Sequence, residues 1–188
     1  MDALTALHTR VSCGLLTDPA PSVEQRQNIF RAALRAADHG CLRPWRFLVV
    51  EGEARERLGE LFLRAAEHEA SEPLAEAQRQ RTLAMPLRAP LIVVAITRLQ
   101  KHPKVPELEQ HLSTAGAVQA MLTAAFAQDI GAYWRTGPLA YNPVVAEGLG
   151  LADNERIDGF LYCGTRQKAV RQAPNLPVED FFAPWDAQ

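Results

Sequence analysis

Several polar and charged side chains stand near the ends of expected helices and strands, where they could gather around a ligand. Arg10 and Ser12 follow a first short helix. Arg35 and His39 lie one turn apart in the last turn of a second helix, and Arg135 leaves a core strand. Arginine binds phosphate through paired, charge-assisted hydrogen bonds, and a serine hydroxyl can join it. Each residue alone also has a structural alternative, because cations stabilise helix C-termini and a long arginine reaches solvent along its apolar stem.

The sequence lacks the short motifs of several other chemistries. It contains no GxGxxG or GxxxxGK[ST] loop for nucleotide phosphates, no HExxH metal motif and no GxSxG nucleophile turn. His102 and His111 fall within residues 98–111, a polar stretch that we expect to be a loop with solvated histidines. These absences argue against a hydrolase or a zinc enzyme, and we predict no metal site.

Length and composition are typical of one ordinary globular domain, which we expect to span residues 1–188. The chain is 47% hydrophobic and 22% charged, and its formal net charge of −2 gives no basic surface for nucleic acid or anionic membranes. The N-terminus lacks the pattern of a secretion signal, and no segment has the length and apolar character of a membrane span. The three cysteines are widely separated, so we expect no disulfide framework and a cytoplasmic setting.

The stretch from Ala115 to Gly137 looks like the element around which the chain is organised. Residues 115–126 are apolar or small on nearly every side, which predicts a buried central helix. Gly131 is a plausible stop for that helix. Residues 132–137 then form a strand-like piece, from which Arg135 emerges.

The remaining pattern predicts helices and strands without regular βαβ alternation, and therefore an α+β fold with at least four strands. Phe181, Phe182 and Trp185 lie in an irregular tail over residues 166–188, which packs either on its own domain or on the partner in a dimer. The other expected helices cover residues 2–9, 22–40, 53–69, 74–83 and 142–149, and the other expected strands cover residues 47–50, 91–96 and 157–163.

Six short segments together resemble the nitroreductase family, and most closely its short YdjA-like branch. They are Met1-Asp2-Ala3-Leu4, Arg10-Val11-Ser12, Pro19-Ala20-Pro21, Arg31-Ala32 to Asp38-His39, Pro44-Trp45 and Trp134-Arg135-Thr136-Gly137. The resemblance runs from Met1 to about Thr165. It implies an FMN-binding α+β homodimer with a central mixed or antiparallel sheet flanked by helices. The flavin sites of such a dimer lie at the subunit interface, and NADH or NADPH supplies the electrons.

The resemblance also implies which residues hold the cofactor. The N-terminal segment would bind the FMN phosphate, and Arg35 and His39 would reach the flavin from the second subunit. The segment Ala124 to Asp129 matches a stretch associated with NADP in this branch. No side chain is needed as a catalytic acid, because the flavin carries the chemistry. The implied cofactor-binding residues are Arg10, Val11, Ser12, Arg35, His39, Trp134, Arg135 and Thr136.

Three positions depart from the pattern of the family. Relatives carry Arg-Arg-Ser where this chain has Val11 in the middle, and a further arginine where it has Leu15. Arg43 stands where many relatives have Asn or Gln before Pro-Trp. The lost cations predict weaker retention of FMN, unless Arg43 or another cation compensates.

The implied activity is an FMN-dependent NAD(P)H oxidoreductase that reduces nitroaromatics, quinones or other small acceptors. Hydride would pass through the flavin in a ping-pong order, with no nucleic acid or membrane as partner. Two alternatives stay open from the sequence. One is a flavin-binding or storage protein without turnover, and the other is a specialised flavin chemistry on the same fold.

Overall fold

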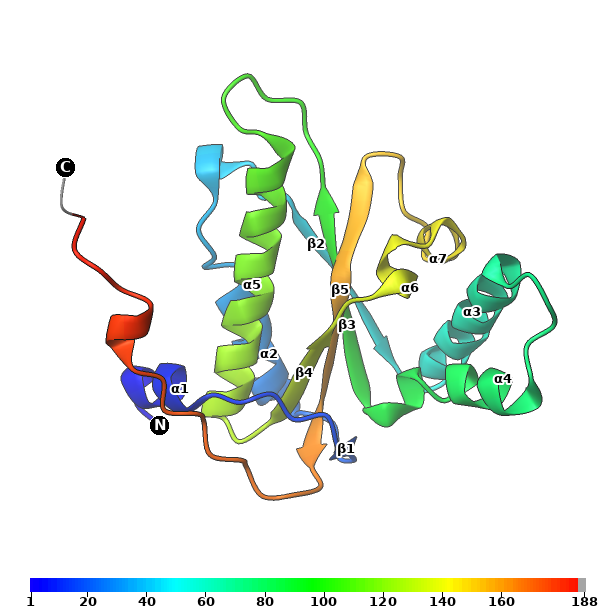
Figure 1. Ribbon diagram of the computed structural model, residues 1–188, viewed down its shortest axis with the longest axis horizontal. Helices are drawn as coiled ribbons and strands as arrows, with labels where there is room; N and C mark the ends of the chain where they lie inside the picture. The colour runs from blue at the N-terminus through cyan, green and yellow to red at the C-terminus, as the bar shows by residue number, and fades with distance from the viewer. Residues whose placement is uncertain (186–188) are drawn as a thin grey trace.

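A five-stranded sheet forms the centre of the structure, a computed structural model that describes residues 1–185 (Figure 1). Every strand pairing in it is antiparallel, and the strands run in the order β1-β5-β3-β2, with β4 pairing on β5. This confirms the α+β class and decides between a mixed and an antiparallel sheet. The strands are β1 (Leu16–Thr17), β2 (Trp45–Glu51), β3 (Leu91–Arg98), β4 (Gly131–Arg135) and β5 (Glu155–Arg166).

Helices cover both faces of the sheet, and local capping signals define several of their ends. Asp2 caps the first helix, Ser22 and Gln25 form a capping box at the predicted start of the second, and Asn142 caps the last helix. The helices are α1 (Ala3–Thr9), α2 (Val23–Ala33), α3 (Ala54–Glu69), α4 (Glu76–Leu83), α5 (Glu107–Ala127), α6 (Pro138–Tyr141) and α7 (Pro143–Gly148), with 3₁₀ turns η1 (His39–Cys41), η2 (Pro86–Arg88) and η3 (Val178–Asp180). None of these described helices has both the length and the apolar character that crossing a bilayer requires.

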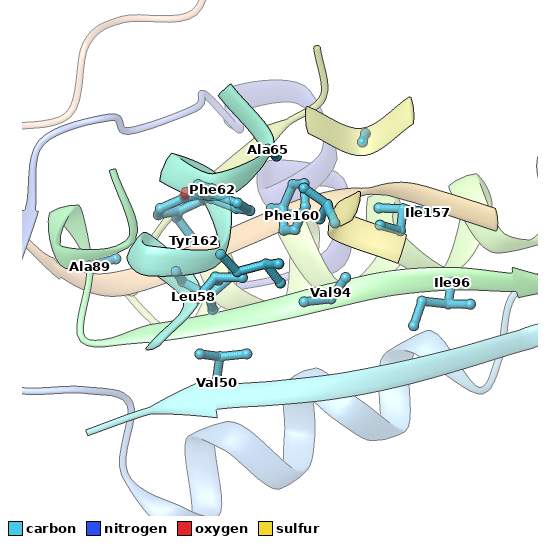
Figure 2. Close-up of a cluster of buried hydrophobic side chains, with 14 of the residues drawn as sticks. Val50, Leu58, Phe62, Ala65, Ala89, Val94, Ile96, Ile157, Phe160 and Tyr162 are labelled. Atoms are coloured by element: carbon cyan, nitrogen blue, oxygen red, sulfur yellow. The ribbon is translucent and has the colours of Figure 1, made fainter. Parts of the chain in front are cut away.

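The central strand β3 is buried on both faces, which explains its continuous apolar sequence. Val94 and Ile96 point toward α3 and α7, where the rings of Phe62 and Phe160 meet edge to face with centroids 5.3 Å apart (Figure 2). Val93 belongs to a second core, formed with α2 and α5 on the opposite face. The sheet therefore separates two hydrophobic cores.

The central helix α5 differs from its prediction at both its start and its outer face. It begins at Glu107, inside the stretch predicted as a polar loop, because acidic residues in the first turn favour a helix N-terminus. Val118 and Met121 are fully buried against the sheet. Leu108 and Leu112 on the outer face, however, are 67% and 61% exposed. The helix is therefore covered on one side only in a single chain.

The second helix is shorter than predicted. The helix α2 ends at Ala33 rather than at Gly40, because the N–H groups of the next residues bond only three residues back and tighten the chain. Gly40 then adopts a φ of +73°, a conformation that suits glycine. Arg35 and His39 therefore do not share one helical face, which corrects the predicted one-turn spacing.

The C-terminal tail is irregular, as predicted, apart from η3. Its aromatic side chains do not pack on the chain itself, since Phe181, Phe182 and Trp185 are 68%, 75% and 90% exposed. This removes the alternative in which the tail buries its aromatic residues on its own domain. Packing on a partner subunit stays a prediction.

Candidate functional site

The N-terminal segment after α1 forms one wall of a hollow of about 340 Å³. The Cys13 N–H donates to the Ala132 carbonyl at 2.9 Å, and the Gln167 N–H donates to the Leu15 carbonyl at 3.1 Å. These bonds hold the segment between β4 and the chain that follows β5. Two of the predicted site residues, Val11 and Ser12, line this hollow.

Cations that the sequence reading missed line the same hollow. They are Arg166, Lys168 and Arg171, and none of the described lining residues carries a carboxylate. Arg166 is fixed in place, because it pairs with Asp129 at 2.5 Å and lies 5.0 Å from the centre of the Phe126 ring. The signal was a basic run that begins at the last residue of β5 and continues after it, in residues that we had assigned to an irregular tail. The hollow is suited to an anion.

Arg10 contributes a further observation. It is half-buried at the C-terminal end of α1, and its Nη1 atom is buried without a hydrogen-bond partner among the described residues. A buried guanidinium N–H without a partner is costly, so a ligand that accepts its hydrogen bond would be stabilised. A phosphate oxygen is an acceptor of this kind.

The strand β4 carries the other group of predicted residues into a second cleft, of about 420 Å³. The Arg135 guanidinium lies 4.5 Å from the Tyr133 ring centre and 5.6 Å from that of Tyr162. The arginine therefore stacks on aromatic rings instead of only extending into solvent. Trp134 and Thr136 line the same cleft.

The ring of Trp134 is held in one orientation. Its Nε1 donates to the Asp158 carbonyl at 3.1 Å. Gly159 leaves room for it, because a Cβ there would lie only 2.3 Å from the Trp134 Nε1. Gly159 also has a φ of +137°, which other residues rarely adopt.

The hollow and the cleft adjoin each other along the outer edge of β4. Tyr133 lines both, and a Cβ on Gly14 would lie 4.0 Å from the Arg135 Nη2. The Ala132 carbonyl faces the N-terminal segment, so by strand alternation the backbone of Trp134 faces the same edge. The structure thus brings together residues more than a hundred positions apart in the sequence.

Arg35 and His39 lie elsewhere in the chain. His39 pairs with Glu109 in the first turn of α5, whereas the hollow lies beside Phe126 in the last turn. These two turns are about 25 Å apart along the helix. In a single chain, Arg35 and His39 are therefore not part of the surface formed by the hollow and the cleft.

Two further predicted features are also placed by the structure. The segment from Ala124 to Asp129 is the last turn of α5 and the residues after it, where Phe126 is buried and Asp129 is exposed. Arg43 is exposed with a φ of +49°, and its backbone N–H donates to the Asp38 carboxylate at 2.8 Å. Arg43 is not among the described residues that line the hollow or the cleft.

Comparison with known proteins assigns the chain and its fold to a family. The model of the nitroreductase family matches residues 7–165, which is most of the chain. The chain belongs to the nitroreductase family. This membership makes the protein an oxidoreductase, as the resemblance in the sequence predicted.

Relatives of this chain agree in sequence and in fold. The chain is 42% identical over 177 residues to the Escherichia coli protein named "Putative NAD(P)H nitroreductase YdjA", covering 94% of this chain and 95% of that one. A nitroreductase-like family protein from Bacillus cereus superposes with a TM-score of 0.83 at 22% identity, over 100% of this chain and 97% of that chain. A nitroreductase from Desulfovibrio desulfuricans, solved in complex with FMN, superposes with a TM-score of 0.73 at 20% identity, over 99% of each chain.

Another hollow, of about 950 Å³, involves none of the predicted site residues among its described lining. At its wall, His111 is bound to the Asp158 carboxylate at 2.7 Å, which corrects its prediction as a solvated loop residue. Asp158 also accepts a hydrogen bond from the Thr97 hydroxyl, whose oxygen lies 2.6 Å from the Thr114 hydroxyl oxygen. In the described residues, no group of three or more His, Cys, Asp or Glu side chains could hold a metal ion.

Proposed function

We propose that the protein is an FMN-dependent NAD(P)H oxidoreductase that reduces nitroaromatics, quinones or other small acceptors. The observation that carries this proposal is the continuous surface along β4. It joins a cationic hollow, suited to a phosphate, to an aromatic cleft, suited to a planar ring. The FMN named for the Desulfovibrio protein and the NAD(P)H named for the Escherichia coli protein support the same conclusion.

The residues present fit FMN at its charged end. Ser12 and Lys168 line a hollow whose described lining lacks carboxylates, and Arg10 has a buried N–H without a described partner. These groups would hold the phosphate, with Arg135 at the boundary between the hollow and the cleft. Trp134 and Thr136 would lie beside the ring system. The chemistry that bound FMN supplies is acceptance of a hydride from NADH or NADPH and its later delivery to the acceptor, in ping-pong order.

The rest of the proposed mechanism belongs to the protein chain. The rings of Tyr133 and Tyr162, paired across β4 and β5 beside Arg135, give the cleft an aromatic wall that orients a planar ligand. Arg135 places a positive charge beside that wall, which favours a ligand that gains negative charge on reduction. No side chain needs to donate a proton as a dedicated catalytic acid.

A second copy of the chain completes the proposed site. His39 lies about 25 Å from the hollow along α5, and neither His39 nor Arg35 is among its described lining residues, so a second subunit would supply both. The exposed leucines on the outer face of α5 offer an apolar surface for that subunit. A symmetric homodimer would then contain two equivalent sites.

The visible spectrum of the purified protein, followed by anaerobic titration with NADH and with NADPH, tests this function. We expect a flavin spectrum that bleaches on addition of one or both donors and returns on addition of a quinone or nitroaromatic acceptor. Protein that stays colourless when mixed with excess FMN would exclude the proposal. Flavin binding without bleaching would instead support a flavin-storage protein.

A further inference from the structure

The cleft beside β4 contains more positive charge than a single cofactor phosphate requires. Arg81 from α4 and Arg88 from η2 line it, together with Arg135 from β4. The hollow at the N-terminal segment already has its own cations for the FMN phosphate. Aromatic side chains make up much of the remaining lining, namely Phe62, Tyr133, Phe160 and Tyr162.

These three arginines are not neutralised by the protein. No carboxylate occurs among the described lining residues, and within residues 1–185 none of the three forms an ion pair or a side-chain hydrogen bond. Neighbouring arginines behave differently, since Arg79 on the same helix pairs with Glu67. Burial raises the pKa of Tyr162, and the positive charges of Arg135 and Arg88 oppose that rise, so both charges lie close to its hydroxyl.

The helices that carry the two outer arginines are firmly attached to the core. Gly59 of α3 lies so close to α4 that a Cβ there would be 2.4 Å from the Leu83 carbonyl oxygen. The turn η2 also packs on α3. Arg81 and Arg88 are therefore presented from fixed positions, as a binding site requires.

We propose that this cleft binds the anionic group of an aromatic ligand, with Arg81 and Arg88 holding a carboxylate or phosphate next to the aromatic lining. The inference rests on the proposed function, because the ligand would be an electron acceptor or donor of that reaction. Two sources offer the required chemistry. One is an aromatic acceptor that carries a carboxylate, and the other is NADPH, whose 2′-phosphate distinguishes it from NADH.

Matched pairs of substrates test the proposal in the FMN-loaded protein. The acceptors are 4-nitrobenzoate and its neutral counterpart 4-nitrobenzamide, and the donors are NADPH and NADH. For each pair, the ratio is kcat/KM for the more anionic compound divided by kcat/KM for its counterpart. In the double variant Arg81→Gln/Arg88→Gln, we expect one of these two ratios to fall about tenfold or more. A fall in the acceptor ratio identifies a carboxylate acceptor, and a fall in the donor ratio identifies the 2′-phosphate. Arg64→Gln, an exposed arginine on α3, is the control and should move neither ratio.

Two results would overturn the proposal. One is a folded, FMN-loaded double variant in which neither ratio changes. The other is a loss of FMN affinity with both ratios unchanged, which would assign these arginines to the cofactor's own phosphate.

Calorimetric titration of 4-nitrobenzoate and of NADPH into wild type and into the double variant covers the case in which the protein has no turnover. Tighter binding of either probe to wild type than to the double variant would then support anion binding in the cleft, even if the proposed function failed. Equal binding of both probes to the two proteins would contradict anion binding there. The single variant Arg88→Gln serves if the double variant does not fold.

Discussion

Cations lost at two positions of the N-terminal segment are replaced in space by cations from the end of β5 and beyond. Val11 and Leu15 line the hollow where the family resemblance led us to expect arginines, but Lys168 and Arg171 line it too. The sequence alone predicted weaker retention of FMN, because residues so far apart along the chain could not be placed beside each other. The structure gives a physical reason to expect ordinary retention.

Lys168→Gln should therefore weaken FMN binding. We expect a loss of about 1 kcal/mol, because an exposed lysine that contacts a phosphate is partly screened by solvent. The loss should shrink at high salt. Quenching of FMN fluorescence at low and high salt measures it, with Lys104→Gln, in the loop before α5, as the control. Equal dissociation constants for wild type and Lys168→Gln would place the phosphate elsewhere.

Arg135→Ala should weaken FMN binding by about 1.5–3 kcal/mol, the usual contribution of a hydrogen bond to a charged group. The arginine stacks on Tyr133 at the boundary between the hollow and the cleft, so the change removes charge from both. The same fluorescence titration measures the effect. Arg156→Ala, an exposed arginine on β5, is the control and should bind FMN like the wild type. Unchanged affinity in Arg135→Ala would mean that its charge serves only the protein surface.

The carboxylate of Glu155 controls part of the acid stability. It is buried and accepts hydrogen bonds from Arg46 at 2.8 and 2.6 Å and from Arg98 at 3.2 Å. The bond from Arg46 is the main cause that lowers its pKa from 4.5 to about 2. Because the folded-state pKa is depressed, the stabilisation is complete above pH 4.5 and is lost as the pH falls toward 2.

Glu155→Gln should destabilise the protein at pH 7 by about 2–3 kcal/mol, because Arg46 loses its charged partner inside the structure. The variant should also lose less stability than wild type between pH 4.5 and 3, since the depressed pKa of Glu155 is gone. Urea denaturation at several pH values measures both effects. Glu53→Gln, from an exposed pair with Arg57 at 3.8 Å, should change stability by less than about 0.5 kcal/mol. Equal pH profiles for Glu155→Gln and wild type would contradict the assignment.

At the scale of helices and strands, the sequence best predicted those elements whose ends are set by residues next to them in the chain. The capping box at Ser22 and the cap at Asn142 lie at the predicted positions, and β3 follows from its apolar run. The errors arise where distant segments decide. The strand β1 exists because Leu16 pairs with Arg166, and it is not among the strands that the sequence predicted.

Gly59 shows how one residue sets the distance between two helices. In the middle of a helix, a change from glycine to alanine usually stabilises by up to about 1 kcal/mol. Gly59→Ala should instead destabilise by about 1–3 kcal/mol, because the added Cβ would meet the Leu83 backbone oxygen at 2.4 Å and push α4 away. Urea denaturation measures the change, and Glu60→Ala, at the exposed neighbouring position, should have little effect. A stabilised Gly59→Ala protein would show that α4 yields without cost.

At the scale of the whole molecule, α5 is apolar on two faces. The rest of the chain covers only one of them. The sequence predicted a helix buried on nearly every side, yet Leu108 and Leu112 are largely exposed. His39 likewise lies far from the hollow of its own chain, as the resemblance implies for residues that reach the flavin from a second subunit. A second copy packed on the outer face of α5 would account for both observations. Subunit geometry is not encoded in local patterns, so the sequence could predict the residues but not where they would meet.

Leu112→Glu should therefore convert a dimer into monomers and weaken FMN binding at the same time. A carboxylate at the centre of an apolar interface lacks a partner and loses its hydration, so association becomes unfavourable. Light scattering at micromolar concentration reports the mass, and fluorescence titration reports the affinity for FMN. The control is Val49→Glu, at a residue on the edge strand β2 that is 44% exposed, and it should leave the mass unchanged. If the variant stays dimeric, the interface lies elsewhere. If it becomes monomeric but binds FMN as tightly as wild type, Arg35 and His39 of the second copy do not contribute to the cofactor site.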